Sequence, residues 1–259
     1  MERLPTDDVA VARRALLLLD LTELGDHATD DDVTQLCSRA VTPHGTVAAV
    51  CVWPRHVALS RQLLDGAGVR IATVVNFPSG DESVTRVLSQ TEQALADGAD
   101  DIDLVLPYRS LLQGNMEHVT VVLDAVRAVV PKDDHVLKVI LETGELGGDD
   151  QVERAARTAV GNGADFIKTS TGKTKVSATL GATAVMLRVI GDATWQVGLK
   201  PSGGIRTVAD ARAYLDQADD AMGPAWATPA TFRFGASGLL DALLATIEGA
   251  PAGAAQDGY

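Results

Sequence analysis

The chain has 259 residues, of which 46% are hydrophobic and 22% are charged, so its composition is that of a globular protein. These proportions exclude a disordered, a collagen-like and a disulfide-stapled chain. The formal net charge of −13 disfavours nucleic acid and anionic membranes as partners, because both are themselves negatively charged. This length is compatible with one large α/β barrel or with two small domains.

The N-terminal segment has neither the order of an export signal nor a membrane span. Its apolar run, residues 15–19, is far shorter than the roughly 20 residues that a span needs, and acidic residues flank it. Cys37 and Cys51 are the only cysteines, and two cysteines provide neither a zinc site nor a disulfide framework. We therefore expect a cytoplasmic protein whose cysteines are reduced and buried.

One order of elements recurs along the chain: a helix, a short β-branched or aliphatic strand, a loop and another helix. Strands are expected at residues 18–22, 47–52, 70–76, 101–106, 136–142, 165–170, 196–201 and 231–235. Helices are expected at residues 6–17, 30–40, 54–65, 83–97, 116–130, 149–161, 179–190, 207–218 and 237–247. This alternation predicts right-handed crossovers and a parallel sheet.

Eight such units in about 250 residues predict an α/β fold, a (β/α)8 TIM barrel with an extra N-terminal helix. An open, doubly wound sheet is the alternative, but no GxGxxG follows an early strand to support it. Residues 1–250 are then expected to form a single barrel domain. Residues 251–259 are expected to be a flexible C-terminal tail, because they cannot pack a core.

Several charged side chains are predicted to face the barrel interior, because side chains alternate between the two faces of a strand. The inward set of charged residues consists of Lys138, Glu142, Lys168, Lys200, Asp101 and Asp103. Burying such charges costs roughly several kcal/mol per ion and returns little stability. One alternative is a structural network in which Lys138 pairs with Asp103 or Glu142. The cluster as a whole favours a reactive site, because active sites of this fold lie at the C-terminal strand ends.

Two inward lysines on adjacent strands indicate amine chemistry. A free lysine has a pKa of about 10.4, so roughly one molecule in 2,500 carries the neutral amine at pH 7. Desolvation and a nearby second cation both disfavour the ammonium form. A neutral lysine in an apolar barrel attacks a carbonyl and forms a Schiff base, which accepts electrons as a C–C bond breaks or forms. An inward carboxylate can transfer the protons.

Three loops with small residues follow the last three expected strands and predict a phosphate site. They contain Thr171, Gly172 and Lys173, then Gly203, Gly204 and Arg206, and finally Ser237 and Gly238. Backbone amides in such loops and at helix N-termini bind phosphate, often after strands seven and eight of a barrel. The alternative is that the glycines only make tight turns. The convergence of three loops and two cations favours a small phosphorylated carbonyl compound as substrate.

These motifs together resemble the 2-deoxyribose-5-phosphate aldolase family. The most specific segment is Phe166-Ile167-Lys168-Thr169-Ser170-Thr171-Gly172-Lys173, and further matches occur at residues 76–78, 142–146, 200–206 and 233–237. The resemblance extends from residue 19 to the last residue. It implies a class I, Schiff-base-forming lyase that reversibly splits 2-deoxy-D-ribose 5-phosphate into acetaldehyde and D-glyceraldehyde 3-phosphate. It also implies catabolism of deoxyribose phosphate in the cytoplasm, a homodimer, and no cofactor or metal ion.

The resemblance also implies a role for individual residues. Lys168 would form the Schiff base, and Lys200 would lower the pKa of Lys168. Asp103 would transfer protons together with an ordered water, and Lys138 would orient that aspartate. The C-terminal Tyr259 would help to protonate the enamine.

The residues that the resemblance places at the substrate are Asp20, Thr22, Cys51, Thr171, Gly172, Lys173, Gly203, Gly204, Arg206, Ser237 and Gly238. At Gly238 the chain departs from the family pattern, because some members have a second serine there. A backbone amide at this position would replace the missing hydroxyl as a donor.

Two other functions stay open at the level of the sequence. One is a phosphosugar isomerase on the same barrel, which would use carboxylate and histidine chemistry without an imine. The five histidines all fall in loops, helix starts or strand edges, which disfavours it. The other is a phosphate-binding regulator without catalysis, which the presence of Lys168, Lys200 and Asp103 disfavours.

Overall fold

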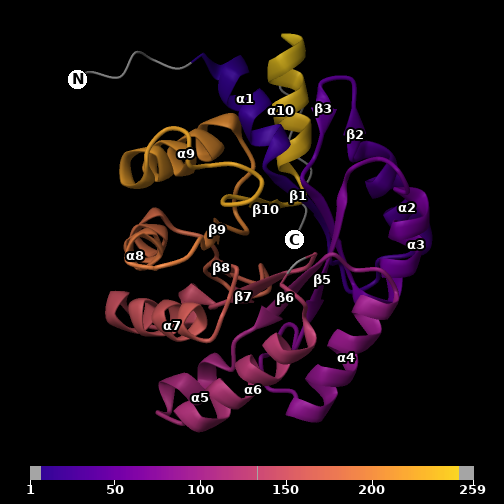
Figure 1. The fold of residues 1–259 in the computed structure, drawn as a ribbon. Helices are drawn as coiled ribbons and strands as arrows, with labels where there is room; N and C mark the ends of the chain where they lie inside the picture. The colour runs from indigo at the N-terminus through magenta and orange to yellow at the C-terminus, as the bar shows by residue number, and fades with distance from the viewer. Residues whose placement is uncertain (1–6, 133, 251–259) are drawn as a thin grey trace.

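Eight parallel strands follow one another around a single sheet in the order β10-β1-β4-β5-β6-β7-β8-β9. They are β1 (Leu19–Glu23), β4 (Ala49–Val52), β5 (Arg70–Val75), β6 (Asp101–Val105), β7 (Val136–Ile140), β8 (Phe166–Lys168), β9 (Gly198–Lys200) and β10 (Phe234–Ala236). The structure is a computed structural model that describes residues 7–132 and 134–250. Figure 1 shows the strands as a ring that the helices surround.

The ring closes between β9 and β10. Two isolated bridges join them, Leu199 with Phe232 and Ser202 with Gly235. In addition, the amide of Gly203 donates to the carbonyl of Gly235 at 3.1 Å. The first and last strands of the sheet therefore meet, and the sheet is a barrel.

The outer layer consists of helices that connect one strand to the next. They are α1 (Asp8–Leu17), α2 (Asp30–Arg39), α3 (Val57–Leu63), α4 (Val84–Ala96), α5 (Tyr108–Leu112), α6 (Met116–Val129), α7 (Asp149–Gly161), α8 (Leu180–Gly191), α9 (Val208–Met222) and α10 (Leu239–Glu248). Helix α1 precedes the first strand and packs against α9 and α10. The predicted (β/α)8 TIM barrel with an extra N-terminal helix is thus confirmed, whereas the predicted tail lies outside the described residues.

Local sequence signals explain where several helices begin. Thr29 and Thr207 each accept a hydrogen bond from the amide three residues later, and the aspartate at that position, Asp32 or Asp210, accepts one from the threonine amide. These capping boxes satisfy amides that the first turn of α2 and of α9 would otherwise leave unpaired. Ser83 caps α4 in the simpler one-bond form.

Some predicted boundaries were wrong. The last strand begins at Phe234 instead of residue 231, because Thr228 and Thr231 form a hydrogen-bonded turn before it. Strands β8 and β9 both end at their lysine, so the residues that follow belong to the loops. Three short elements were not predicted: α5, a 3-10 turn at Thr143–Glu145, and a hairpin of β2 (Val41–Thr42) with β3 (Gly45–Thr46).

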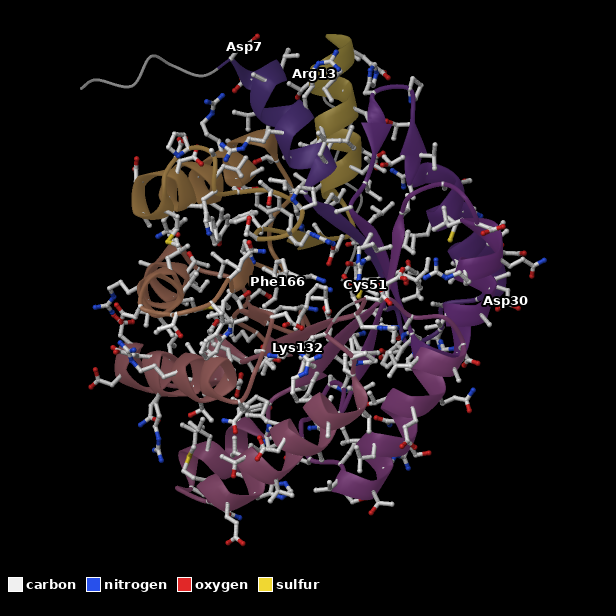
Figure 2. The ribbon with its side chains drawn as sticks, in the orientation of Figure 1. Asp7, Arg13, Asp30, Cys51, Lys132 and Phe166 are labelled. Carbon is white, nitrogen blue, oxygen red and sulfur yellow. The ribbon has the colours of Figure 1, made fainter. Side chains whose placement is uncertain are left out.

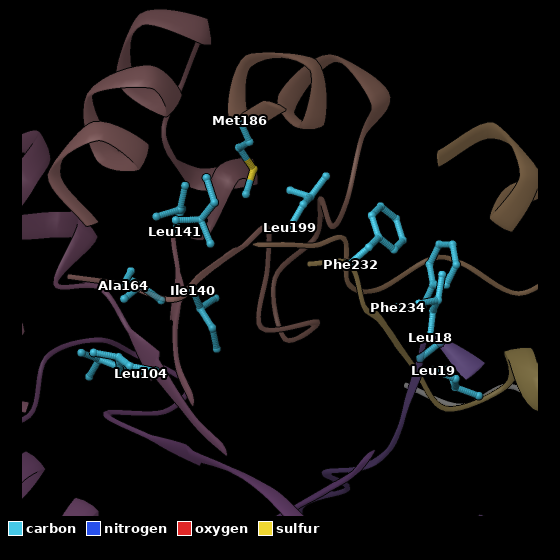
Figure 3. Close-up of a cluster of buried hydrophobic side chains, with 14 of the residues drawn as sticks. Leu18, Leu19, Leu104, Ile140, Leu141, Ala164, Met186, Leu199, Phe232 and Phe234 are labelled. Carbon is cyan, nitrogen blue, oxygen red and sulfur yellow. The ribbon is translucent and has the colours of Figure 1, made fainter. Parts of the chain in front are cut away.

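The main hydrophobic core lies between the strands and the helices. Leu199 of β9 points outward into it near Met186 and Leu141, and Leu104 of β6 belongs to it beside Ala164. These five side chains are at most 1% exposed. Figure 3 shows the same core reaching from Leu104 round to Phe234. Because faces alternate, the neighbours of the outward residues, Asp103 among them, point into the barrel.

The barrel interior itself has an apolar side. A second buried cluster contains Leu24, Ala49, Cys51, Ala72 and Val74, most of them from β4 and β5. Figure 2 shows Cys51 on one side of the ring of strands and Phe166 on the opposite side. Apart from Arg70 at the start of β5, the inward side chains on β4 and β5 are thus small and apolar, and the other charged side chains of the interior lie on other strands.

The close packing around Gly198 predicts that a larger residue at this position lowers stability. A Cβ atom at Gly198 would lie 2.3 Å from the ring of Phe166, which faces it across β8 and β9. We expect Gly198→Ala to lower the free energy of unfolding by about 1–3 kcal/mol, the usual effect of overpacking. Urea titration followed by circular dichroism measures this loss.

The matched control is Gly161→Ala. Gly161 lies in α7, and an added Cβ meets nothing within 4 Å there, so this variant should unfold like the unchanged protein or slightly later. Equal stability of the Gly198→Ala variant and the unchanged protein would contradict the close packing of Phe166 on β9.

Candidate active site

Three lysines and one aspartate meet inside the barrel, on four consecutive strands. Asp103 of β6 faces Lys138 of β7, and Lys168 of β8 faces Lys200 of β9 in the strand register. Asp103, Lys138 and Lys200 are fully buried, and Lys168 is 3% exposed. The structure therefore brings together the lysines and the aspartate that the alternation of strand residues placed in the interior.

All three ammonium groups contact the carboxylate of Asp103. Lys168 Nζ donates to Asp103 Oδ2 at 2.8 Å, and Lys200 Nζ donates to the same oxygen at 2.9 Å. Lys138 Nζ donates to the other oxygen at 3.0 Å. Burial alone would raise the pKa of Asp103, but these cations outweigh it and hold the pKa well below its usual range. Asp103 is therefore a carboxylate in the resting site.

Lys200 is held by a second carboxylate from below. Its Nζ lies 2.6 Å from Asp20 Oδ2, and the other oxygen of Asp20 accepts a hydrogen bond from Arg233 Nη1 at 2.7 Å. Burial would lower the pKa of Lys200, but Asp103 and Asp20 together raise it above its ordinary value. Lys200 consequently stays an ammonium ion, and it shares an oxygen of Asp103 with Lys168.

Lys138 has its main partner on β6. Lys138 Nζ donates to Asp101 Oδ2 at 2.6 Å, and the guanidinium of Arg70 holds the other oxygen of Asp101 at 2.7 Å. The proposed pairing of Lys138 with Asp103 is therefore present. The pairing of Lys138 with Glu142 is not among the contacts of the described residues.

Glu142 does not continue β7 as predicted. The strand ends at Ile140, and Glu142 has a left-handed backbone with φ 56°. Its carboxylate accepts hydrogen bonds from the hydroxyls of Thr171 at 2.5 Å and Thr174 at 3.2 Å. Burial raises the pKa of Glu142 above its ordinary value, although the two threonines partly oppose that rise. Glu142 thus anchors the loop after β8 instead of pairing with a lysine.

A cavity opens above Lys168 at the C-terminal ends of the strands. Eight of the residues predicted to bind substrate line it: Thr22, Thr171, Gly172, Gly203, Gly204, Arg206, Ser237 and Gly238. Lining residues that the sequence reasoning did not assign to the site are Leu24, Ser202, Ile205, Gly235 and Ala236. All of these except Leu24 belong to the sequence motifs of the last loops. Their position in those motifs was the signal from which they could have been predicted.

The loop end of this cavity is rich in backbone donors. The amides of Gly172, Gly204 and Gly238 have no hydrogen-bond acceptor within the part of the chain that the structure describes. Gly172 and Gly204 have φ of 80° and 78°, a conformation that favours glycine. Gly238 is the N-cap of α10, so the positive end of that helix points to the cavity. This end of the cavity suits an anion.

Three other predicted substrate residues do not line the cavity. Asp20 lies fully buried beneath Lys200, and Cys51 lies in the apolar cluster. Burial raises the pKa of the Cys51 thiol, so the thiol stays protonated. Lys173 Nζ donates to Asp26 at 2.7 Å on the rim. Tyr259 lies outside the described residues.

The sequence reasoning gave no role to three charged residues of the network. Asp101 was placed in the interior but without a partner, and Arg70 and Arg233 were not considered as site residues. Both arginines lie at strand starts, where a sequence pattern does not reveal whether a long side chain turns into the barrel. Only the coordinates show that each one holds a buried aspartate.

The described residues contain no group of three or more histidine, cysteine or acidic side chains arranged to hold a metal ion. None of the helices in the described ranges is both long and apolar enough to cross a membrane. The site consists of Lys168 at the floor of a cavity, the carboxylate of Asp103 beneath it, and a loop end that is rich in backbone donors.

Comparisons with known proteins agree with this geometry. The model of a family described as DeoC/LacD family aldolase matches residues 14–245. A deoxyribose-phosphate aldolase from Agrobacterium fabrum is 50% identical over 249 residues, which are 96% of each chain. An apo-form structure assigned to a deoxyribose-phosphate aldolase of Toxoplasma gondii has a TM-score of 0.86 and 28% identity, and the match covers 93% of this chain and 97% of that one.

A structure assigned to a deoxyribose-phosphate aldolase of Coccidioides immitis is also similar. Its TM-score is 0.80 at 28% identity, and the match covers 95% of this chain and 88% of the other. In each of these comparisons the similarity extends over most of both chains.

Proposed function

The chain belongs to the DeoC/LacD family of aldolases, and we propose that it is a deoxyribose-phosphate aldolase. In this proposal it reversibly cleaves 2-deoxy-D-ribose 5-phosphate to acetaldehyde and D-glyceraldehyde 3-phosphate. The observation that carries the proposal is Lys168, which lies at the floor of an anion-binding cavity and donates to a carboxylate that Lys200 also holds. The relative at 50% identity, named a deoxyribose-phosphate aldolase, supports the choice of substrate.

In the first step the neutral amine of Lys168 attacks the aldehyde carbon of the open-chain sugar. The resulting carbinolamine loses water and becomes an iminium ion on Lys168. A base removes the proton of the C3 hydroxyl, the C2–C3 bond breaks, and its electron pair moves towards the iminium nitrogen. This releases glyceraldehyde 3-phosphate and leaves an enamine. Protonation of the enamine at C2 and hydrolysis then release acetaldehyde.

Asp103 is suited to the proton transfers of these steps because its surroundings change during the reaction. In the resting site three ammonium groups lower its pKa. When the nitrogen of Lys168 is neutral, as in the carbinolamine and the enamine, one of these charges is gone and the carboxylate binds a proton more readily. Lys138 and Lys200 continue to hold both oxygens in place.

The phosphate of the substrate is proposed to bind at the loop end of the cavity. The amides of Gly172, Gly204 and Gly238 supply donors there, and Arg206 and Ser237 line the same end. The amide of Gly203 supports this end indirectly, because it already donates to the carbonyl of Gly235. Lys173 belongs to the rim, where it pairs with Asp26.

The middle of the cavity is proposed to bind the substrate hydroxyls. Thr22 and Thr171 line it near Lys168. Asp20 is assigned a supporting part in this region, because it is buried and holds Lys200. Cys51 contributes to the apolar side of the interior, where a protonated thiol serves as a small apolar group.

The arrangement of the histidines supports the aldolase over the phosphosugar isomerase. His56 contacts Asp30 at 3.0 Å and His44 contacts Glu248 at 3.1 Å, both outside the cavity. Among the described residues, none of the five histidines lines the cavity. An isomerase would need a base such as histidine or a carboxylate at the reacting carbons, whereas the cavity floor presents an amine.

Three properties of the whole protein complete the proposal. We place the enzyme in the cytoplasm, in the catabolism of deoxyribose phosphate, and as a homodimer. We assign residues 1–250 to the catalytic domain, and we propose that Tyr259, which lies outside the described residues, protonates the enamine. The proposal of a homodimer is based on the family resemblance. Gel filtration with light scattering measures the oligomeric state.

The central experiment traps the Schiff base. Treatment with acetaldehyde and borohydride should leave a reduced adduct on Lys168, because the imine nitrogen becomes a stable secondary amine. Peptide mapping by mass spectrometry locates the adduct, and Lys168→Leu is expected to abolish both the adduct and cleavage. An unmodified Lys168 peptide together with full turnover would support chemistry without an imine and contradict the aldolase.

Replacing Lys200 should change the pH dependence of the reaction. The pKa of Lys200 is raised, so this residue stays cationic and opposes the ammonium form of Lys168. In Lys200→Leu this repulsion is lost, and Lys168 keeps its proton to higher pH. We expect kcat/KM at neutral pH to fall by orders of magnitude and to recover in part at alkaline pH.

The control for this charge change is Lys175→Leu, because Lys175 is an exposed lysine outside the cavity lining. It should have the activity and the pH profile of the unchanged protein. If Lys200→Leu keeps full activity at neutral pH, Lys200 does not have the assigned role.

Deletion of Tyr259 tests the part of the tail. We expect enamine protonation to slow while Schiff-base formation continues at its normal rate, because only enamine protonation would use the tyrosine hydroxyl. Exchange of the acetaldehyde methyl protons with deuterated solvent, followed by NMR, reports protonation separately from trapping. Equal loss of both steps would instead indicate a structural role for the tail.

A further inference from the structure

Arg233 lies directly before β10, at the end of the barrel opposite the cavity, and its side chain is 4% exposed. Its Nη1 donates to Asp20 Oδ1 at 2.7 Å, and its Nε donates to the carbonyl of Pro229. The guanidinium also lies 3.7 Å from Asp101 Oδ2 and 5.9 Å from the ring centre of Phe166. Burying a guanidinium in this way is expensive unless its charge is used.

The buried charges of the interior do not cancel. The positive groups are Arg233, Lys138, Lys168 and Lys200, and the negative groups are Asp20, Asp101 and Asp103. When all of them are ionised, one positive charge is therefore in excess. Adding Arg70, which holds Asp101 from the rim, and Glu142, which anchors the loop after β8, leaves this excess unchanged.

The three lysines differ in how many carboxylates hold them. Within 4 Å, Lys138 Nζ has three carboxylates and Lys200 Nζ has two. Lys168 Nζ has a single one, Asp103, and it is the lysine that lines the cavity. Lys168 is accordingly the lysine of the three with the fewest carboxylates around its Nζ.

Resting on the proposed function, we propose that Arg233 is a positioning residue that makes the proton of Lys168 dispensable. Arg233 cannot lose its own proton and holds one oxygen of Asp20 permanently. With Asp20 matched in this way, Lys138 and Lys200 suffice for the remaining two carboxylates. Without Arg233, three lysines face three carboxylates, and all three are needed as cations.

The other groups that face this network belong to several elements. They are Cys51 of β4, Arg70 of β5, Phe166 of β8, the carbonyl of Pro229, and at the lower rim Lys132, His135 and Asp165. Arg70 is 34% exposed, so water screens its charge more than that of Arg233. Asp165 is paired with Arg127 on the outside. The guanidinium of Arg233 is therefore a nearly buried cation of this network, and unlike the lysines it cannot give up its proton.

The test is the pH profile of kcat/KM, whose acid limb reports proton loss in the free enzyme. Arg233→Met removes the charge but keeps a long side chain, and it should move the midpoint of the acid limb upward by about one to three pH units. Arg233→Lys keeps the charge and should stay near the unchanged protein. Circular dichroism and urea titration confirm that each variant is folded.

A matched double variant separates charge from structure. Arg233→Met combined with Asp20→Asn removes one charge of each sign, so the excess cation is restored and the midpoint should return towards that of the unchanged protein. If the shift in Arg233→Met came from a structural defect, adding Asp20→Asn would instead enlarge the displacement of the midpoint. If Arg233→Met alone does not fold, the double variant serves as the test. An acid-limb midpoint of the double variant that stays a full pH unit away from that of the unchanged protein overturns the proposal.

Two further outcomes would overturn it. One is a folded Arg233→Met protein with an unchanged midpoint, and the other is an equal shift in Arg233→Met and Arg233→Lys. The trapping experiment distinguishes these results from a failure of the proposed function. If the unchanged protein forms no adduct on Lys168, the aldolase assignment fails, whereas a normal adduct with an unchanged midpoint rejects only the role of Arg233.

Discussion

The structure depends on the carboxylate of Asp103, around which three ammonium groups gather inside a closed barrel. Charges in such a place are costly unless opposite charges are matched to most of them, because little water reaches them. The match requires the inward faces of β6 to β9 to stand in one register, with Asp103 opposite Lys138 and Lys168 opposite Lys200. It also requires aspartates beneath the lysines and an arginine beneath one of those aspartates.

The same crowding explains the small residues of the barrel. Gly235 leaves space for Lys200, since a Cβ there would lie 3.1 Å from Lys200 Cε and 2.2 Å from Ser202 Oγ. On the other side of the interior, Ala49, Ala72 and their neighbours are small and apolar. A low dielectric on one side and a dense ion network on the other strengthen every interaction at the cavity floor. Reactivity thus comes from the packing of the whole ring.

Much of the fold and of the site could be predicted from the sequence, because the two strongest signals, the alternation of residues along a strand and the spacing of the elements, are local. The alternation along β7 and β8 placed Lys138 and Lys168 inside, and regular spacing of the elements indicated the barrel. Glu142 was misplaced because its left-handed backbone ends the alternation, and no pattern announces such a turn. The pairing of Arg233 with Asp20 joins residues 213 positions apart, so only the folded chain reveals it.

The barrel closes between β9 and β10 through bridges and loop hydrogen bonds, without the continuous ladder that joins its other strands. Ser202, Gly203 and Gly235 make one of these closures, and all three line the cavity. A ligand seated there touches both sides of the seam and favours the state in which the seam is shut. By linkage, occupancy of the cavity stabilises the fold itself. A molecule bound in this cavity would therefore hold β9 and β10 together.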